Sequence, residues 1–84
     1  MTDYVLTEHA RTVLSERSID EKWVAGILRH PEREEPDREN PELKHALGHI
    51  PEHDGRVLRV VYNASTQPVR VVTAFFDRTQ RNKL

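Results

Sequence analysis

The sequence predicts a single α+β domain of 84 residues, with an N-terminal helical hairpin packed on one face of an antiparallel sheet of three or four strands. Two segments in the first third carry apolar residues at the three- and four-residue spacing of one-sided helices. In the second half, Asp54-Gly55 is typical of a hairpin turn, and two runs rich in β-branched residues follow it. Because the helices precede the strands instead of alternating with them, the order favours a helical layer on an antiparallel sheet.

The helical hairpin is expected over residues 7–30. Thr7 can cap the first helix, because its hydroxyl can accept a hydrogen bond from a free amide of the first turn. Asp20 can cap the second helix in the same way, and Pro31 ends it, since a residue before proline is pushed out of the helical region. Tyr4–Leu6 is too short to assign and would be an edge strand at most. The apolar positions of the two helices are Ala10, Val13, Leu14, Trp23, Val24, Ile27 and Leu28.

The stretch from residue 32 to residue 42 holds six acids, two bases, two prolines and no apolar residue. It has nothing to bury, so we expect a mobile acidic loop. Its carboxylates lack the ordered spacing of a calcium-binding loop, which favours a solvated run of charge over a metal site. Residues 43–50 fit a helix and a strand about equally, and Gly48, which weakens a helix, favours the strand.

The antiparallel sheet is expected over residues 43–76, with a basic tail over 77–84. Alternation within Arg56–Asn63 gives an apolar face that should meet the helices, formed by Leu58, Val60 and Tyr62. The opposite face of this strand carries Arg59 between two valines. On the last strand, one face should be shared by Val69, Val71, Thr73 and Phe75. Neither face is frankly polar, so the second face is either covered or a working surface.

Arg59 needs a partner, because a charged group in the middle of a strand is poorly placed without one. A guanidinium matches phosphate oxygens in a bidentate way and keeps its charge, which suits a phosphodiester ligand. Alternatively, Arg59 pairs with a carboxylate across the sheet or extends to water. The sequence leaves both interpretations open.

Charge is distributed unevenly along the chain, although the formal net charge is only −1. Residues 32–42 carry a net charge of −4, whereas residues 56–84 hold six bases against Asp77 alone, a net charge of +5. A basic segment of this kind can face a polyanion such as RNA. The arginines expected to contact nucleic acid there are Arg56, Arg70, Arg78 and Arg81.

His9 is the first candidate for acid–base catalysis. Its imidazole exchanges a proton near neutral pH, and the helix N-terminus where it lies favours a bound phosphate. Arg17 lies eight residues further on, so both can line one edge of the helix, while a purely structural role for the histidine stays open. His45, His49 and His53 recur at four-residue spacing, but His45 and His49 would stand about 13 Å apart on a strand, too far to chelate one ion. No metal site is therefore expected.

Composition excludes several classes of protein. The chain has no cysteine, which excludes a disulfide framework, a thiolate nucleophile and a zinc site with cysteine ligands. No uninterrupted apolar run exceeds three residues, so no membrane span is expected. The first residues lack the basic-then-apolar order of a signal peptide, and we expect a cytoplasmic protein.

A resemblance to a known family covers roughly two-thirds of the chain. A small bacterial family, the domain-of-unknown-function family 4258, is similar at its opening to LTEHARTVLSERSIDEKWVAGILRHPE and at its closing hairpin to GRVLRVVYNASTQPVRVVTAFFDR. That family is similar in turn to the RelE-like and barnase-like toxins, many of which are ribonucleases of toxin–antitoxin systems that act without a metal. The resemblance implies roles for His9, Arg11, Arg17, Arg59, Thr73 and Arg78.

Together these observations predict an endoribonuclease that cleaves single-stranded RNA without metal or cofactor and is held in check by an antitoxin-like protein. Its catalytic residues would be His9, Arg17 and Arg59. Its nucleic-acid contacts would be Arg11, Arg56, Arg70, Thr73, Arg78 and Arg81. The alternative is a non-catalytic module that binds protein or nucleic acid through the same basic face, and exposed strand edges would allow a homodimer. The catalytic interpretation requires His9 and Arg59 to face one shared hollow, and it lacks a second proton carrier.

Overall fold

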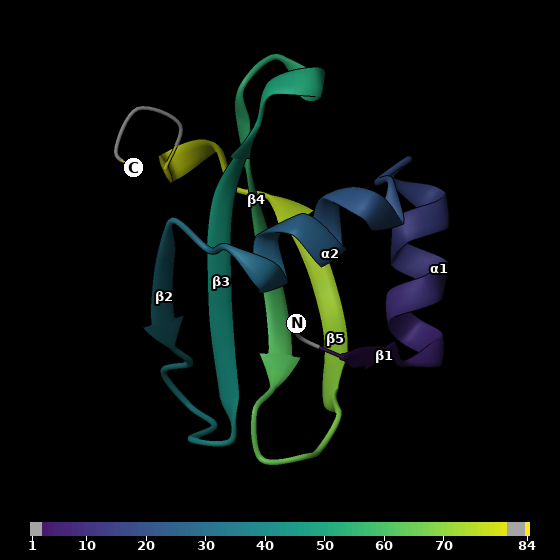
Figure 1. The fold of residues 1–84 in the computed structure, drawn as a ribbon, viewed down its shortest axis with the longest axis vertical. Coiled ribbons are helices and arrows are strands. Elements are labelled where there is room, and N and C mark those ends of the chain that lie inside the picture. Colours follow the sequence, from purple (N-terminus) through teal and green to yellow (C-terminus); the bar gives the residue numbers. More distant parts are fainter. Residues whose placement is uncertain (1–2, 81–83) are drawn as a thin grey trace.

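The structure is a computed structural model that describes residues 3–80 and 84, and it has the predicted α+β architecture (Figure 1). Two helices and five strands follow one another along the chain. They are β1 (Tyr4–Leu6), α1 (Glu8–Glu16), α2 (Glu21–Arg29), β2 (Arg33–Pro36), β3 (Leu43–Ile50), β4 (Arg56–Asn63) and β5 (Val69–Phe76). Short 3-10 turns follow β3 and β5, at Pro51–His53 and Arg78–Gln80.

The helical hairpin begins and ends close to the predicted residues. The hydroxyl of Thr7 accepts from the amide of Ala10 at 3.1 Å, and the carboxylate of Asp20 accepts from the amide of Lys22 at 2.8 Å. Each helix buries one apolar stripe, as the periodicity predicts. The stripes consist of Ala10, Val13 and Leu14 in α1, and of Val24, Ile27 and Leu28 in α2.

The sheet is larger than predicted and mixed. Its strand order is β1-β5-β4-β3-β2, and β1 pairs with β5 in parallel while the other pairs are antiparallel. The expected antiparallel sheet therefore corresponds to β3, β4 and β5, and one further strand is added at each edge. The segment 43–50 is a strand, as favoured above.

Within the segment expected to be a mobile acidic loop, residues 33–36 form the edge strand β2, so that prediction was wrong for this part. The strand lies along β3, with Arg33 opposite Leu47 and Pro36 opposite Lys44. An edge strand tolerates proline because one of its sides needs no partner. Carboxylates hold β2 from both sides of the sheet: the Tyr62 hydroxyl donates to Glu34 at 2.7 Å on the helix side, and Arg59 donates to Glu35 on the other.

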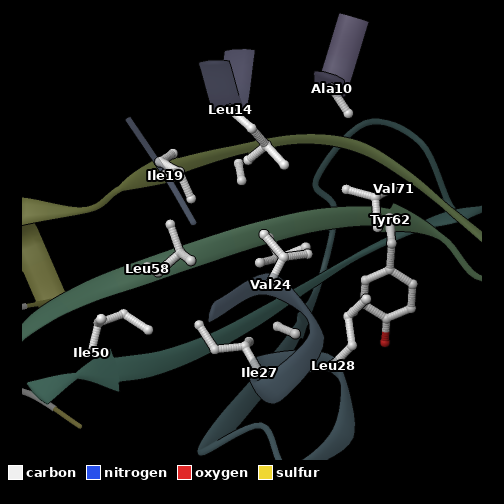
Figure 2. Close-up of a cluster of buried hydrophobic side chains, with 13 residues drawn as sticks. Ala10, Leu14, Ile19, Val24, Ile27, Leu28, Ile50, Leu58, Tyr62 and Val71 are labelled. Atoms are coloured by element: carbon white, nitrogen blue, oxygen red, sulfur yellow. The ribbon is translucent and has the colours of Figure 1, made fainter. Parts of the chain in front are cut away.

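The main core lies between the helices and the sheet (Figure 2). Leu58, Val60 and Tyr62 of β4 face the helices, as the alternation predicts. The prediction for β5 was wrong, because a β-bulge shifts the register: Val71 lies opposite Tyr62 and Thr73 lies opposite Val61. An extra residue in one strand reverses the alternation beyond it. Residues facing the helices before and after the bulge are therefore Val71 and Ala74.

The other face of the sheet carries no helix of the α1–α2 layer, and we call it the helix-free face. It still buries apolar side chains almost completely, with exposed fractions of 0% for Leu47, 1% for Val57 and 6% for Val61. Polar side chains from β2 and from the Arg78–Gln80 turn reach over it, as in the 2.8 Å hydrogen bond from Arg33 to Gln80. The second face is thus covered, by polar side chains instead of a second helical layer.

Within the described residues, the helices are too short to cross a membrane.

Candidate functional site

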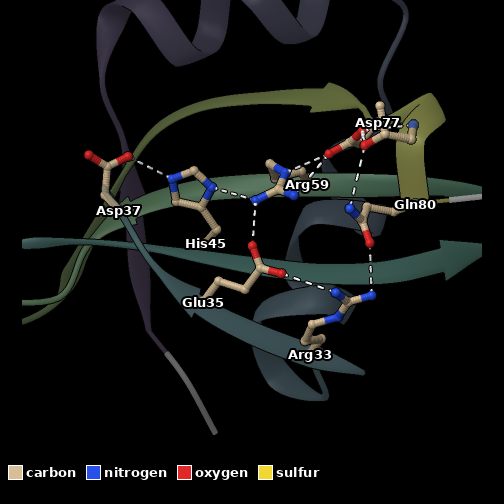
Figure 3. A network of polar contacts seen from close by, with 8 residues as sticks. Arg33, Glu35, Asp37, His45, Arg59, Asp77 and Gln80 are labelled. Atoms are coloured by element: carbon tan, nitrogen blue, oxygen red, sulfur yellow. Dashed lines mark hydrogen bonds and ion pairs between the residues drawn. The ribbon is translucent and has the colours of Figure 1, made fainter. Parts of the chain in front are cut away.

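The helix-free face contains an open hollow of about 420 Å³, which we call the polar hollow. It lies between β2 with its following loop on one side and β4 with the end of β5 on the other. Figure 3 shows the polar side chains that meet there. The residues that line it are Glu35, Pro36, Asp37, Arg38, Glu39, His45, Arg59, Phe75 and Asp77.

Arg59 is the centre of the polar hollow, and its side chain is only 11% exposed. Its Nε and Nη2 both lie 2.9 Å from Oδ2 of Asp77. Its Nη1 lies 3.2 Å from Oε1 of Glu35 and 2.7 Å from Nδ1 of His45. Of the two interpretations of Arg59, the structure therefore supports the second, in which the guanidinium pairs with carboxylates from neighbouring elements.

His45 is held as a single neutral tautomer by its two partners. A guanidinium can only donate hydrogen bonds, so Nδ1 of His45 must accept from Arg59. The ring proton then sits on Nε2, which donates to Oδ1 of Asp37 at 2.8 Å. A carboxylate, an imidazole and a guanidinium therefore form one chain, in which Asp37 orients the ring and its lone pair points at Arg59.

Three carboxyl groups of the polar hollow, those of Glu35, Asp37 and Asp77, are ionised at neutral pH. The hydrogen bond from Arg59 lowers the pKa of Glu35 below its ordinary 4.5. The hydrogen bond with His45 lowers the pKa of Asp37, and the hydrogen bond from the Thr79 hydroxyl, followed by that from Arg59, lowers the pKa of Asp77. Each carboxylate can act as a proton acceptor and none is a proton donor in this state.

The lowered pKa values of Glu35 and Asp77 predict that the protein loses stability in acid. A carboxyl group whose folded pKa lies below its ordinary value contributes stability that is present above the ordinary value and lost as the pH falls through the folded value. The ordinary values are 4.5 and 3.8. We expect the free energy of unfolding, measured with urea, to fall steadily below about pH 4.5. Asp77→Asn, which cannot ionise, should show a shallower fall, and an equally steep one would contradict this assignment.

The structure does not bring His9 and Arg59 into a shared hollow. His9 is exposed on α1, which packs through Ala10 and Leu14 on the helix side of the sheet. Arg59 projects from the opposite side, because it alternates with Leu58 and Val60. A helix N-terminus can be recognised locally, but the face of the sheet on which the helix packs depends on distant residues.

Arg17 lies at the C-terminal end of α1 and donates to the backbone oxygen of Ala74 at 3.3 Å. That oxygen belongs to β5, so Arg17 occupies a hydrogen-bonding position at the strand's outer edge. Protecting a strand edge with a basic side chain is a common device against unwanted pairing. Arg17 therefore has a structural role at the outer edge of β5.

The expected nucleic-acid contacts do not gather in one place. Arg11 lies on α1, and Thr73 lies on the helix-free face opposite Val61. Arg56 opens β4 and Arg70 pairs with the residue that ends it, so these two stand about 23 Å apart along the strand. The two others lie at the C-terminal end: Arg78 is exposed in the last 3-10 turn, and Arg81 falls outside the described residues.

Four members of the polar hollow were missed as site residues. Glu35 and Asp37 were assigned to a solvated loop, His45 was considered only as a metal ligand, and Asp77 was the single acid of the basic segment. Nothing local to Glu35 or Asp77 indicates their pairing with β4, because both pairings depend on the register of the sheet. The other candidate metal ligands are engaged elsewhere: His49 pairs with Glu32, and His53 packs against Trp23 and Phe76.

The comparisons with known proteins place the chain in a family. A family model described as a domain of unknown function (DUF4258) matches residues 6–76. No curated protein and no solved structure matches the chain. The family match runs from the end of β1 to the end of β5 and includes every residue that lines the polar hollow except Asp77. The chain therefore belongs to the DUF4258 family.

Proposed function

We propose that this protein is a cytoplasmic, metal-independent endoribonuclease that cleaves single-stranded RNA in the polar hollow. One observation carries the proposal: Nδ1 of His45 and Oε1 of Glu35 both contact Nη1 of Arg59. Cleavage of RNA without a metal needs a base for the 2′-hydroxyl, an acid for the leaving oxygen and a cation for the phosphorane charge. As part of the same proposal, the chain is similar to the RelE-like and barnase-like toxins, and this similarity is consistent with RNA cleavage without a metal.

The three groups have distinct roles. Glu35, ionised because Arg59 lowers its pKa, takes the proton of the 2′-hydroxyl as that oxygen attacks phosphorus. Once Arg59 has turned to the phosphate, Nδ1 of His45 takes a proton from solvent water and gives it to the 5′-oxygen as the P–O5′ bond breaks, while Glu35 later releases its proton to water. The products are a 2′,3′-cyclic phosphate and a 5′-hydroxyl. Arg59 neutralises the charge of the pentacovalent phosphorus.

Two further carboxylates position these groups. Asp37 fixes the imidazole of His45 through Nε2, as the carboxylate does in other histidine dyads. Asp77 holds the Nε and Nη2 edge of Arg59, which leaves the Nη1 edge toward Glu35 and His45. This set also supplies the second proton carrier that the sequence-based set lacked.

The test is cleavage of a single-stranded RNA oligonucleotide by the purified chain in EDTA. We expect 2′,3′-cyclic phosphate ends, and we expect His45→Ala and Glu35→Gln each to slow cleavage by about 100-fold. His9→Ala is the matched control and should cleave at the normal rate. RNA that stays intact at high protein concentration would contradict the proposal, and loss of cleavage in the His9 variant alone would move the site to α1.

A second candidate is a non-catalytic module that binds a protein partner, and the charge of the hollow favours it. Four carboxylates line the hollow (Glu35, Asp37, Glu39 and Asp77), against two guanidinium groups, those of Arg38 and Arg59. This balance attracts a cationic segment, such as one from an antitoxin-like protein, and opposes RNA. Intact RNA together with salt-sensitive binding of a lysine-rich peptide, unchanged by His45→Ala, would favour the module over the enzyme.

A further inference from the structure

We propose that Phe75 is a stacking platform for the base next to the phosphate bound at Arg59, so that the polar hollow prefers a purine at that position. The inference rests on the proposed function, because it names the part of the RNA that the same site recognises. The hollow has a volume of about 420 Å³, within the usual range of about 300–1,000 Å³ for small-molecule sites. It can therefore hold more of the RNA than a phosphate group alone.

Phe75 contributes an aromatic ring to a hollow that is otherwise lined mainly by charged and polar side chains. It is half-buried, although the other large apolar side chains on this face of β3 and β4 are almost completely buried: Leu47, Val57 and Val61. The main core between the helices and the sheet does not include it. A large apolar ring is thus left partly open at the hollow.

The neighbouring Phe76 shows what a phenylalanine with a purely structural role does in this strand. It points to the helix side of the sheet, where its ring centroid lies 4.7 Å from that of His53 and 6.2 Å from that of Trp23. Among the described residues, no aromatic ring packs on Phe75. The face of its ring is therefore available to a flat ligand.

The register of the sheet places Phe75 directly opposite Arg59. Side chains at opposite positions of two antiparallel strands share a face, and their Cβ atoms lie about 4.5–5.5 Å apart. Nη1 of Arg59 contacts Glu35 and His45, and this is where the proposed function places the phosphate. A phosphate at Arg59 would thus have an aromatic ring beside it. An anionic group next to a flat ring is the chemistry of a nucleotide.

Stacking would also explain how RNA binds in a hollow whose carboxylates outnumber its guanidinium groups. The attraction between a base and an aromatic side chain does not depend on net charge, and every base has a face that can stack. Preferences among bases then follow stacking strength, and the two fused rings of a purine cover more of the Phe75 ring than the single ring of a pyrimidine. A platform of this kind accepts all bases and favours purines.

The experiment is an NMR titration of the full chain with three-nucleotide strands that lack 2′-hydroxyls and cannot be cleaved. Each strand carries a base only at its central position, which is adenine, cytosine or abasic. We expect the ring signals of Phe75 and His45 to shift with the adenine strand. The cytosine strand should bind more weakly than the adenine strand, and the abasic strand more weakly than adenine by roughly tenfold or more.

Two variants of Phe75 separate stacking from simple burial. Phe75→Leu keeps an apolar side chain and should lower the affinity for the adenine strand to that for the abasic strand, whereas Phe75→Trp should keep it. Phe76→Leu is the matched control, because it makes the same change at the next residue. It should lower the melting temperature, since it loses the contacts with Trp23 and His53, and leave the affinity unchanged.

The outcomes distinguish this inference from the proposed function. Equal affinity for the adenine and abasic strands, or adenine binding unchanged by Phe75→Leu, would overturn the platform and leave RNA cleavage in place. Base-dependent binding at Phe75 by a chain that leaves RNA intact would support the platform and overturn the cleavage. Strands that shift neither Phe75 nor His45 would overturn both.

Discussion

Replacing Asp77 with alanine is expected to lower the free energy of unfolding by about 3 kcal/mol. Asp77 is the carboxylate that meets both Nε and Nη2 of Arg59, and the two side chains are only 12% and 11% exposed. Removing it leaves Nε and Nη2 of a poorly solvated guanidinium without their carboxylate, while only Nη1 keeps its partners Glu35 and His45. Leaving a buried charge incompletely paired costs more than the intact pair contributes. Urea unfolding followed by circular dichroism measures the change.

Two further variants test the cause of this loss. Glu39→Ala removes an exposed carboxylate from the same hollow and should change stability by less than about 0.5 kcal/mol. Adding Arg59→Met to Asp77→Ala should restore part of the lost stability, because it removes the incompletely paired charge while keeping an apolar stem. A double variant less stable than Asp77→Ala would show that the unpaired edge of the guanidinium is not the main cause of the loss.

Replacing Leu47 with alanine should lower the free energy of unfolding by about 3 kcal/mol, as much as replacing Leu58 with alanine. Both leucines are 0% exposed, but Leu58 faces the helices and Leu47 lies on the helix-free face. The polar covering of that face must exclude water from Leu47 as effectively as α2 does from Leu58. Thermal and urea unfolding of the two variants give the comparison, and a cost for Leu47→Ala below about 1 kcal/mol would mean that this covering is open in solution.

The helices and the helix-facing side of β4 could be predicted because their signals are local. The caps at Thr7 and Asp20, the stop at Pro31 and the alternation of Leu58 and Val60 each depend on residues within one turn or one strand. A periodic apolar stripe indicates which side of a helix is buried, so the sequence was enough to predict that this side of α2 contacts the sheet.

The edge strands and the bulge could not be predicted, because their signals are not local. Residues 33–36 have no apolar residue, and they form β2 only because β3 offers a free edge and Tyr62 and Arg59 offer partners to the acids. β1 is three residues long and pairs with β5, more than sixty residues away. No residue in this run of β-branched side chains indicates the bulge after Val71.

The candidate site was predicted in one part. Arg59 was recognised as a candidate because a guanidinium between two valines needs a partner. In the structure, its partners are two carboxylates and an imidazole. Those partners come from β2, β3 and the end of β5, and only the register of the sheet brings them together. Arg59 does not contribute to the basic surface expected over residues 56–84, because Glu35 of the acidic segment and Asp77 both pair with it.

Histidine NMR can show whether RNA binds at the polar hollow on the helix-free face. The chain labelled at its five histidines would be titrated with a single-stranded RNA analogue lacking 2′-hydroxyls, which cannot be cleaved. If RNA binds there, the ring signals of His45 shift and those of His9 do not. Shifts at His9 with none at His45 would contradict it.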